Sequence, residues 1–282
     1  KKGLIKKVVA SALLGIMTMG LVGCGSSNNT SAAGNKNDLL ETIQDKGKVV
    51  VGMSADYAPY EFHYIDENGK DVIGGFDVDI ANEIASKLGV ELVIQEMDFD
   101  ALVTALPAGK VDLVISGMNP TEERAKVVDF SEVYYNSQHG ILVRAEDVDK
   151  YKTFADLEGA KVGAQLGSTQ EQIAKNEIPN ADLQLLANVN NLILELKSGK
   201  VDAIIMEKPV AQMAVKSNPE LAVGEPTYEE ESGGNAVGVA KGNEELLAKV
   251  NEVIKELNET GKMDEYIVKA NELAATANIV EE

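Results

Sequence analysis

Apolar and polar positions along the chain fall into blocks with two different periods. The segment GKVVVGM (47–53) is a compact run rich in β-branched residues, which is typical of a buried strand. FDVDIANEIASKLG (76–89) places apolar residues four positions apart and closes on glycine, as an amphipathic helix with a stop signal does. A second strand is predicted at 90–97, a second helix at 99–109 and a third strand at 111–118. This order predicts βαβ units, with helices on the faces of a parallel sheet.

One phrase of this pattern occurs twice. The segment ALPAGKVDLVISGM (105–118) is echoed by ELKSGKVDAIIMEK (195–208), and both carry GKVD between a helix and a β-branched strand. Glycine after a helix and aspartate before a strand are common, so coincidence is one interpretation. The other, which we prefer, is a pair of α/β lobes of similar build. The segment VGAQLG (162–167) would then open the second lobe, as VVVGM opens the first.

The N-terminal segment has a different character. KKGLIKK (1–7) is basic, and the apolar stretch that follows (8–23) is short for a membrane span and fits a secretory signal peptide. The stretch ends in LVGC, which resembles the lipobox of bacterial lipoproteins. That resemblance implies cleavage after residue 23 and a lipid such as palmitate on Cys24. The alternative interpretation of Cys24 is a buried free thiol. The Ser/Asn/Gly-rich residues 24–37 then predict a flexible tether, and an extracytoplasmic protein anchored to the cell membrane.

Composition narrows the classes of partner. The 282 residues include 46 acidic and 26 basic side chains, a formal net charge of −20 and a single cysteine. This length allows one large domain or two ordinary ones, and the hydrophobic fraction of 44% suffices for a core. Nucleic-acid binding needs a basic face, which such an acidic chain is poorly suited to provide. A single cysteine excludes an intramolecular disulfide.

Arginine use singles out one residue. The basic residues include two arginines, Arg124 and Arg144, and the rest are lysines. A guanidinium can hold a carboxylate through two parallel hydrogen bonds, which an ammonium cannot. Arg124 closes the segment NPTEER (119–124), directly after the third predicted strand. A surface salt bridge with a nearby glutamate is the simpler interpretation.

Two predicted helix starts strengthen the anion-binding interpretation. In NPTEER, Asn119 is expected as the N-cap, with Pro120 and Glu122 as the first and third helical residues. In QLGSTQEQIA (165–174), Ser168 is the expected N-cap and Glu171 the partner in a capping box. Each start follows a strand, where open α/β sheets bind ligands and where free N–H groups attract anions.

An amino acid would present an ammonium group as well as a carboxylate. Glu207, at the end of the repeated second-lobe strand, could bind that ammonium, although an ion pair with Lys208 is equally consistent with the sequence. The segment ADYAPYEF (55–62) offers Tyr57, Tyr60 and Phe62 as walls of an apolar pocket or as core residues.

In their order along the chain, these segments resemble the polar amino-acid-binding lipoproteins of ABC importers. That family, bacterial extracellular solute-binding protein family 3, includes lysine/arginine/ornithine-, histidine- and glutamine-binding proteins. The resemblance covers about 39–270 and rests on six segments: YAPYEF, GGFDVDIANEIASKLG, MDFDALVTALPAGKVDLVISGM, TEERAKVVDFSEVYY, VGAQLGSTQE and VDAIIMEKPVA.

The resemblance implies an α/β type II periplasmic-binding-protein-like fold of two lobes with a hinge of two crossing strands. Residues 38–132 and 228–275 would form the first lobe, 133–227 the second and 276–282 a C-terminal tail. The protein would capture a polar L-amino acid between its lobes and deliver it to a membrane permease. It would be a monomer without cofactor, metal or enzymatic activity.

The resemblance also implies roles for individual residues. Arg124 matches the arginine that binds the α-carboxylate, and Thr169, beside Ser168, matches a donor to the same group. Glu207 matches the acid that binds the α-ammonium, a position where the family usually has aspartate. The remaining expected ligand contacts are the strand-end residues Ser116, Gly117 and Asn119, the aromatic pair Tyr57 and Phe99, and the side-chain positions Ser54 and Gln165.

The identity of the ligand side chain stays open at this point. Binders of cationic amino acids have aspartate at the position of Ser54, so Asp56 or Glu61 would have to replace it here. Gln165, where glutamine binders have lysine, and Gln138 could instead hold a polar side chain. Arginine, lysine, histidine and glutamine are all consistent with these residues.

Two other functions use the same fold. Dehydratase-like and murein-cleaving enzymes would need a positioned acid or base, but the two histidines, His63 and His139, suggest no Ser-His-Asp or Cys-His set. We expect His63 to lie in an exposed hairpin. The second of these functions, that of a sensory amino-acid-binding lipoprotein, would use the same cleft.

Overall fold

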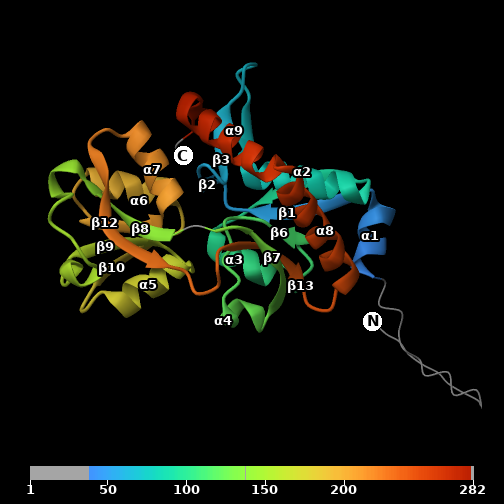
Figure 1. The fold of residues 1–282 in the computed structure, drawn as a ribbon, viewed down its shortest axis with the longest axis horizontal. Helices are drawn as coiled ribbons and strands as arrows, with labels where there is room; N and C mark the ends of the chain where they lie inside the picture. Colours follow the sequence, from blue (N-terminus) through green and yellow to red (C-terminus); the bar gives the residue numbers. More distant parts are fainter. Residues whose placement is uncertain (1–37, 137, 281–282) are drawn as a thin grey trace, which may run out of the picture. The chain divides into compact units, whose positions relative to one another are not determined.

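The computed structural model describes residues 38–136 and 138–280. The predicted signal peptide, the tether and Cys24 lie outside these residues. The described chain forms two lobes, each built on a five-stranded sheet (Figure 1). This arrangement confirms the two-lobe α/β class expected from the sequence.

The first lobe contains the predicted parallel βαβ units. Its sheet has the order β5-β1-β6-β13-β7, in which β1 is parallel to β5 and β6 while β13 is antiparallel to β6 and β7. Helix α2 ends at Leu88, and Gly89 takes up the left-handed conformation (φ 71°), as the predicted stop signal requires. Helix α3 ends at Ala105, earlier than predicted, because Pro107 lacks the N–H that would continue it. The elements of this lobe are α1 (Leu39–Lys46), β1 (Lys48–Met53), α2 (Phe76–Leu88), β5 (Glu91–Glu96), α3 (Phe99–Ala105), β6 (Leu113–Val114), α4 (Glu122–Ala125), β7 (Val128–Tyr135), β13 (Asn235–Ala240), α8 (Glu244–Thr260) and α9 (Lys262–Thr276).

The second lobe has the sheet order β10-β9-β11-β8-β12. Strands β9, β10 and β11 are parallel, and β8 runs antiparallel to β11 and β12. The elements are β8 (Gln138–Arg144), η1 (Ala145–Asp147), η2 (Phe154–Leu157), β9 (Lys161–Gln165), α5 (Thr169–Glu177), β10 (Asp182–Leu186), α6 (Val189–Lys197), β11 (Ala203–Glu207), α7 (Lys208–Ser217) and β12 (Leu221–Glu229).

The GKVD repeat has the same structural role in both lobes. Gly109 and Gly199 both have positive φ (66° and 76°) and lead into the equivalent strands β6 and β11. The following aspartate then accepts a backbone N–H from a neighbouring parallel strand, β1 in the first lobe and β9 in the second: Asp112 Oδ2 lies 2.8 Å from Val50 N, and Asp202 Oδ2 lies 3.0 Å from Lys161 N. The two copies of the repeat therefore have equivalent structural roles, as the interpretation of two similar lobes predicts.

The chain passes between the lobes twice. The first passage lies between β7 and β8, beyond the predicted boundary at 132, and the second between β12 and β13, beyond the one at 227. Gly234 is needed where the passages touch, since a Cβ there would lie 2.1 Å from the carbonyl oxygen of Tyr135. The strands extend past the predicted boundaries because pairing with distant strands fixes their ends.

A small third sheet joins the N- and C-terminal parts of the first lobe. Strands β2 (Asp56–Tyr57), β3 (Glu61–Ile65) and β4 (Asp71–Gly74) pair in succession, and β14 (Asn278–Ile279) pairs with β3. The expected C-terminal tail from 276 is therefore partly a strand, since edge pairing with β3 has no signal in the local sequence. His63 lies in the expected hairpin, half-buried, with Nδ1 2.8 Å from Asp71 and Nε2 3.0 Å from Glu96.

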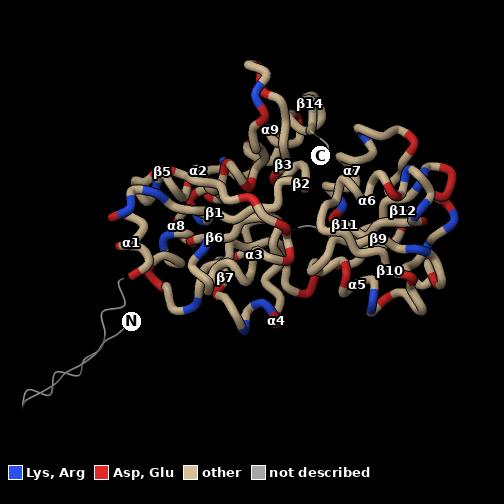
Figure 2. The backbone as a smooth tube through the Cα atoms, turned by 180° about the vertical axis from the view of Figure 1, so that it is seen from behind, with Lys and Arg blue, Asp and Glu red and all other residues tan. Residues whose placement is uncertain are grey.

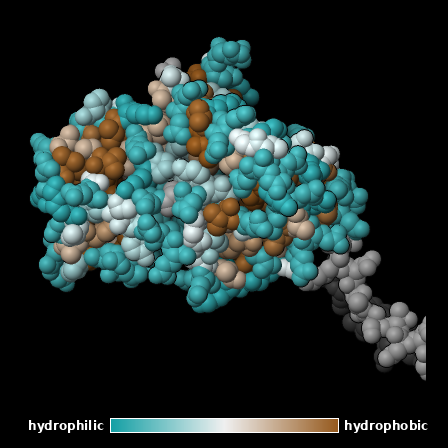
Figure 3. Space-filling view, viewed as in Figure 1, coloured by the Kyte–Doolittle hydropathy of each residue, from teal (hydrophilic) through white to brown (hydrophobic). Residues whose placement is uncertain are grey.

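The face of the protein in Figure 3 is largely hydrophilic, with small apolar patches. Acidic positions occur across both lobes (Figure 2). Within residues 38–136 and 138–280, no helix combines the length and the hydropathy needed to cross a bilayer.

Candidate functional site

Arg124 lies on the short helix α4, at the edge of the first lobe that meets the second. The N-cap of α4 is Thr121, whose hydroxyl accepts the Arg124 N–H at 3.3 Å, so the expectation of Asn119 as the cap is wrong. The Asn119 side chain is engaged elsewhere: its Nδ2 donates to Gly234 O at 3.1 Å, and its Oδ1 accepts from Thr169 at 2.8 Å.

The guanidinium of Arg124 bonds to both lobes. Nη1 donates to the carbonyl of Asn119 at 2.8 Å, and Nη2 donates to the carbonyl of Gly167, across the cleft, at 3.0 Å. The group also lies 5.3 Å from the centre of the Phe99 ring. Burial lowers the pKa of Arg124 to about 10, against the opposing effect of the charges of Glu230 and Glu123. Both of these acceptors are neutral carbonyls, so the guanidinium has capacity for an anion.

The facing edge of the second lobe is the start of α5. Ser168 caps this helix as predicted, because its hydroxyl accepts the Glu171 N–H at 3.2 Å. Glu171 does not complete the expected capping box, since its carboxylate accepts the N–H of Gly167 at 2.8 Å, one residue before the cap. Gly167 (φ 75°) packs against the first lobe so tightly that a Cβ would lie 2.8 Å from Cβ of Asp100.

Glu207 ends β11 and is fully buried among first-lobe groups. One carboxylate oxygen accepts Asn235 Nδ2 at 3.0 Å, and the other accepts the hydroxyl of Tyr60. Asn235 Nδ2 also donates to Gly117 O at 2.8 Å. Lys208, the alternative partner, places its Nζ 2.6 Å from Thr227 Oγ1. Glu207 is thus a buried acid that accepts hydrogen bonds from two side chains of the first lobe.

The two predicted aromatic residues lie near different groups. Phe99 lies beside Arg124, whereas Tyr57 packs on Gly117, whose Cβ, if present, would lie 3.3 Å from Cδ1 of the ring. The Tyr57 hydroxyl accepts the backbone N–H of Glu207 at 3.1 Å and Gln170 Nε2 at 3.0 Å. Tyr57 therefore reaches from the first lobe to two residues of the second.

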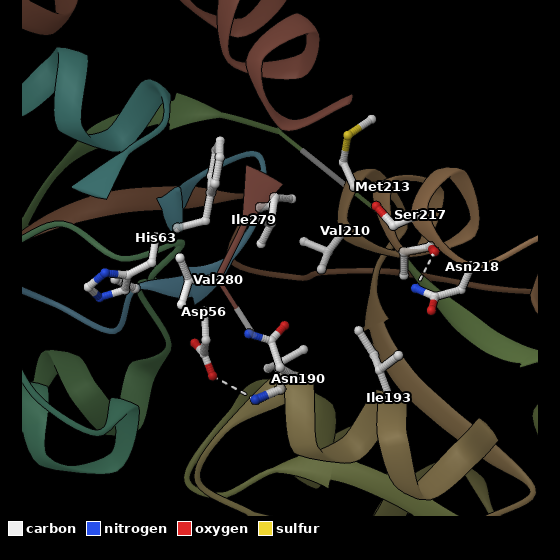
Figure 4. Close-up of a pocket in the computed structure, with 15 residues that line it drawn as sticks. Asp56, His63, Asn190, Ile193, Val210, Met213, Ser217, Asn218, Ile279 and Val280 are labelled. Atoms are coloured by element: carbon white, nitrogen blue, oxygen red, sulfur yellow. Dashed lines mark hydrogen bonds between the residues drawn. The ribbon is translucent and has the colours of Figure 1, made fainter. Parts of the chain in front are cut away.

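Asp56 occupies the far end of the cleft. Its Oδ2 accepts the N–H of Val189, at the start of α6 in the second lobe, at 2.6 Å (Figure 4). Ser54 Oγ donates to Oδ1 at 3.2 Å. Gln165 Nε2 lies 3.5 Å from both oxygens. Burial raises the pKa of Asp56 to about 6. The structure thus brings the predicted residues Ser54 and Gln165 together around one carboxylate.

A cavity of about 360 Å³ opens beside Asp56. Its lining includes the carboxylates of Asp56, Glu96 and Asp98 together with His63, and contains no lysine or arginine among the residues that the structure describes. A second hollow, which Asp56 also lines, lies where Ile279 and Val280 face Ile193 and Val210 of the second lobe (Figure 4). The cavity beside Asp56 is thus acidic, and the hollow is mainly apolar.

Several residues that form hydrogen bonds in and around the cleft were not predicted as site residues from the sequence. Asn235 and Gln170 bond Glu207 and Tyr57, but neither belongs to a pattern that marks a ligand site. His139 is buried, with Nδ1 3.3 Å from Gln170 and Nε2 3.4 Å from Glu230. No group of three or more potential metal ligands occurs in the part of the chain that the structure describes.

The family model of bacterial extracellular solute-binding proteins, family 3, matches residues 49–270. The chain belongs to this family. The match spans both lobes and includes Asp56, Arg124 and Glu207.

Individual relatives are similar over nearly their whole length. An arginine-binding extracellular protein of Bacillus subtilis, ArtP, is 37% identical over 92% of this chain and 96% of its own. A probable histidine-binding protein of Campylobacter jejuni is 34% identical over 94% and 98%. The crystal structure of the amino acid ABC transporter substrate-binding protein AbpA from Streptococcus pneumoniae, bound to L-arginine, superposes with a TM-score of 0.81 at 41% identity, covering 83% of this chain and 99% of that one.

Proposed function

We propose that this protein binds a free L-amino acid between its lobes and presents it to the membrane subunits of an ABC transporter. The observation that carries the proposal is the pairing, across one cleft, of a first-lobe guanidinium with a second-lobe carboxylate, Arg124 and Glu207. A zwitterion offers one charge to each. The relatives include proteins named as arginine- and histidine-binding, which supports the same class of ligand.

The α-carboxylate would lie against Arg124. Its oxygens would replace the carbonyls of Asn119 and Gly167 as acceptors of the two N–H groups, which are 2.8 and 3.0 Å from those carbonyls. Charge-assisted bonds are about twice as strong as neutral ones, so the exchange favours the ligand. Thr169, at the start of α5, supplies a hydroxyl donor and the positive end of a helix dipole to the same group.

The α-ammonium would lie between Glu207 and the first-lobe strand ends. The carbonyl of Gly117 and the side chain of Asn119 are acceptors there, and both already belong to the network that joins the lobes. Each lobe then contributes part of the site, so ligand binding favours the closed arrangement. Tyr57 and Phe99 would lie along the ligand's side chain, and Ser116 and Ser168 would hold the backbone around its charged end.

We propose a cationic side chain, arginine first, for the ligand. Asp56 and the carboxylates of the cavity beside it offer negative charge and hydrogen-bond acceptors at the far end of the cleft. An amide side chain would leave that charge unmatched, which is costly for a buried carboxylate. Ser54 and Gln165 would fix the orientation of Asp56 rather than carry the charge.

We also propose that the protein works outside the cytoplasmic membrane, as a monomer held by lipid on Cys24. The support is the basic and apolar leader of residues 1–23 and the LVGC segment before the Ser/Asn/Gly-rich linker. Binding and release require no cofactor and no chemical step, so no catalytic residue is assigned.

The test is calorimetric titration of residues 38–282 with arginine, lysine, histidine and glutamine. We expect arginine to bind most tightly and Arg124→Lys to weaken it at least tenfold, because an ammonium cannot replace the two parallel bonds. Arg144→Lys is the matched control, since Arg144 bonds Leu196 and Val201 carbonyls inside the second lobe. Absence of heat with every amino acid would refute the proposal, and equal losses in both variants would refute the role of Arg124.

A further inference from the structure

Two acidic side chains lie beneath the cleft without contacting the proposed ligand position. Glu61, on β3, and Asp77, in the first turn of α2, are both fully buried. Neither forms an ion pair with a basic residue among the described ranges, although buried carboxylates usually require one. This pair therefore needs another way to remain inside the protein.

Both carboxyl groups hold the strand end that follows β6. Ser116 Oγ donates to Glu61 Oε1 at 2.5 Å and accepts the N–H of Ser54 at 3.0 Å. Asp77 Oδ2 accepts the N–H of Gly117 at 2.8 Å and the hydroxyl of Tyr134 at 2.9 Å. The Ser116–Gly117 peptide is thus held from both sides by acidic side chains.

The other oxygen of each carboxyl group has no donor from a third residue. Glu61 Oε2 and Asp77 Oδ1 are buried and receive no N–H or O–H from elsewhere in the described chain. Each of the two carboxyl groups shifts the pKa of the other, so they lie close together. Two ionised carboxylates would be acceptors only and would repel each other, whereas one proton between them would give both free oxygens a partner.

We propose that Glu61 is a neutral carboxylic acid that donates to the Asp77 carboxylate, and that this shared proton holds Ser116 and Gly117 in position for the ligand. The hydrogen bonds then run in one direction, from Ser54 through Ser116 and Glu61 to Asp77. Glu61 is a positioning residue, because it acts through Ser116 and not on the ligand itself. The link to ligand binding rests on the proposed function, whereas the shared proton does not.

The surroundings decide which group holds the proton. Asp77 accepts two further donors and lies at the N-terminal end of a helix, and both features favour its charged form. Burial, and then the charge of Asp77, raise the pKa of Glu61 well above its usual range, while burial raises the pKa of Asp77 to about 6. The other titratable groups whose charges act on the pair are Asp56 and Glu207, which are acidic, and Tyr134 is bonded to it. None of these neighbours would favour a second negative charge.

Infrared spectroscopy of the ligand-free protein tests the proton directly. At about pH 8, Asp56 and Asp77 are ionised, so the C=O stretch of a neutral carboxylic acid would report Glu61. We expect this band in the wild type, its loss in Glu61→Gln and its persistence in Glu67→Gln, a control in an exposed turn. Absence of the band in the wild type, or its persistence in Glu61→Gln, would overturn the proposal.

Ligand affinity tests the positioning role separately. Glutamine can accept from Ser116 and donate to Asp77 as the neutral acid does, whereas alanine can do neither. We expect Glu61→Ala to weaken arginine binding at least tenfold and Glu61→Gln to restore most of that loss. Failure of glutamine to restore binding more than alanine would overturn the positioning role. If no amino acid binds the wild type, the proposed function fails while the infrared result still decides the shared proton.

Discussion

The equivalent central strands of the two lobes, β6 and β11, lead to side chains of opposite charge. Both strands follow GKVD, and both are anchored by the same aspartate-to-backbone bond. After β6 the chain continues with small and amide residues and reaches a cation, Arg124, whereas β11 ends directly on an acid, Glu207. Strand ends that share a scaffold and differ in charge match the two ends of a zwitterion. Asp112 and Asp202 thus help to build their lobes, whereas Arg124 and Glu207 are the residues that we propose to bind the ligand.

The largest changes in ligand affinity are expected when the charge of Arg124 or Glu207 is removed. Arg124→Ala should weaken arginine binding by about 2–5 kcal/mol, roughly 30-fold or more, because a ligand carboxylate would be buried without its partner. Glu207→Gln should cost less, since the amide keeps the volume and one acceptor oxygen. Titration calorimetry of both variants measures the difference. Equal and small losses would contradict the assignment of one charge to each lobe.

The second largest effect is expected from Asp56→Asn, which should change the preference for arginine over glutamine. We expect arginine affinity to fall by about 1–3 kcal/mol while glutamine affinity falls less, because only a cation depends on the negative charge. Asp98→Asn is the matched control, since Asp98 lines the same cavity but is exposed. A parallel loss for both ligands would exclude Asp56 as the charge partner.

The same residue predicts two opposite pH dependences. The pKa of Asp56 is about 6 in the folded protein, above its ordinary value, so the stability that it contributes is greatest at low pH and is lost as pH rises to about 6. Arginine binding needs the charged form and should instead strengthen as pH rises through about 6. Thermal unfolding and calorimetry, each at several pH values, should show these trends, and Asp56→Asn should flatten both.

Gly167 tests closure without altering charge. Gly167→Ala places a Cβ 2.8 Å from Asp100 of the other lobe, whereas Gly199→Ala, at nearly the same φ, meets no atom within 4 Å. Both substitutions carry about 1 kcal/mol of backbone strain. We therefore expect similar melting temperatures but weaker arginine binding in Gly167→Ala alone. Equal affinities would mean that closure does not require this contact.

The smallest effects concern the repeat itself. Asp112→Asn and Asp202→Asn should each lower the free energy of unfolding by about 0.5–1.5 kcal/mol, because an amide is a weaker acceptor for the backbone N–H. Asp202 should matter slightly more, since it also lies 3.4 Å from Arg144. Urea unfolding measures both changes, and arginine affinity should be unchanged in either variant.

Local sequence patterns predicted much of the fold and part of the candidate site. The four-residue spacing in 76–89 and the β-branched run in 47–53 predicted α2 and β1, because each period reflects one buried face. The helix stop at Gly89 and the Ser168 cap were also correct, since both depend on neighbouring residues alone. The predicted N-cap of α4 was wrong because the Asn119 side chain bonds Gly234 and Thr169, which are distant in the chain. The predicted capping box of α5 was wrong because Glu171 accepts the N–H of Gly167 instead.

The sequence by itself determined the alternation of strands and helices, the two related lobes and the unusual position of Arg124. All three depend on local spacing and on the choice of residue at single positions. Tertiary structure alone decided that Asp56 meets the start of α6, that Asn235 bonds Glu207 and that Glu61 lies against Asp77. These partners are far apart in the chain. Burial makes each pairing strong by excluding water, and local spacing specifies which face is buried but not what it meets.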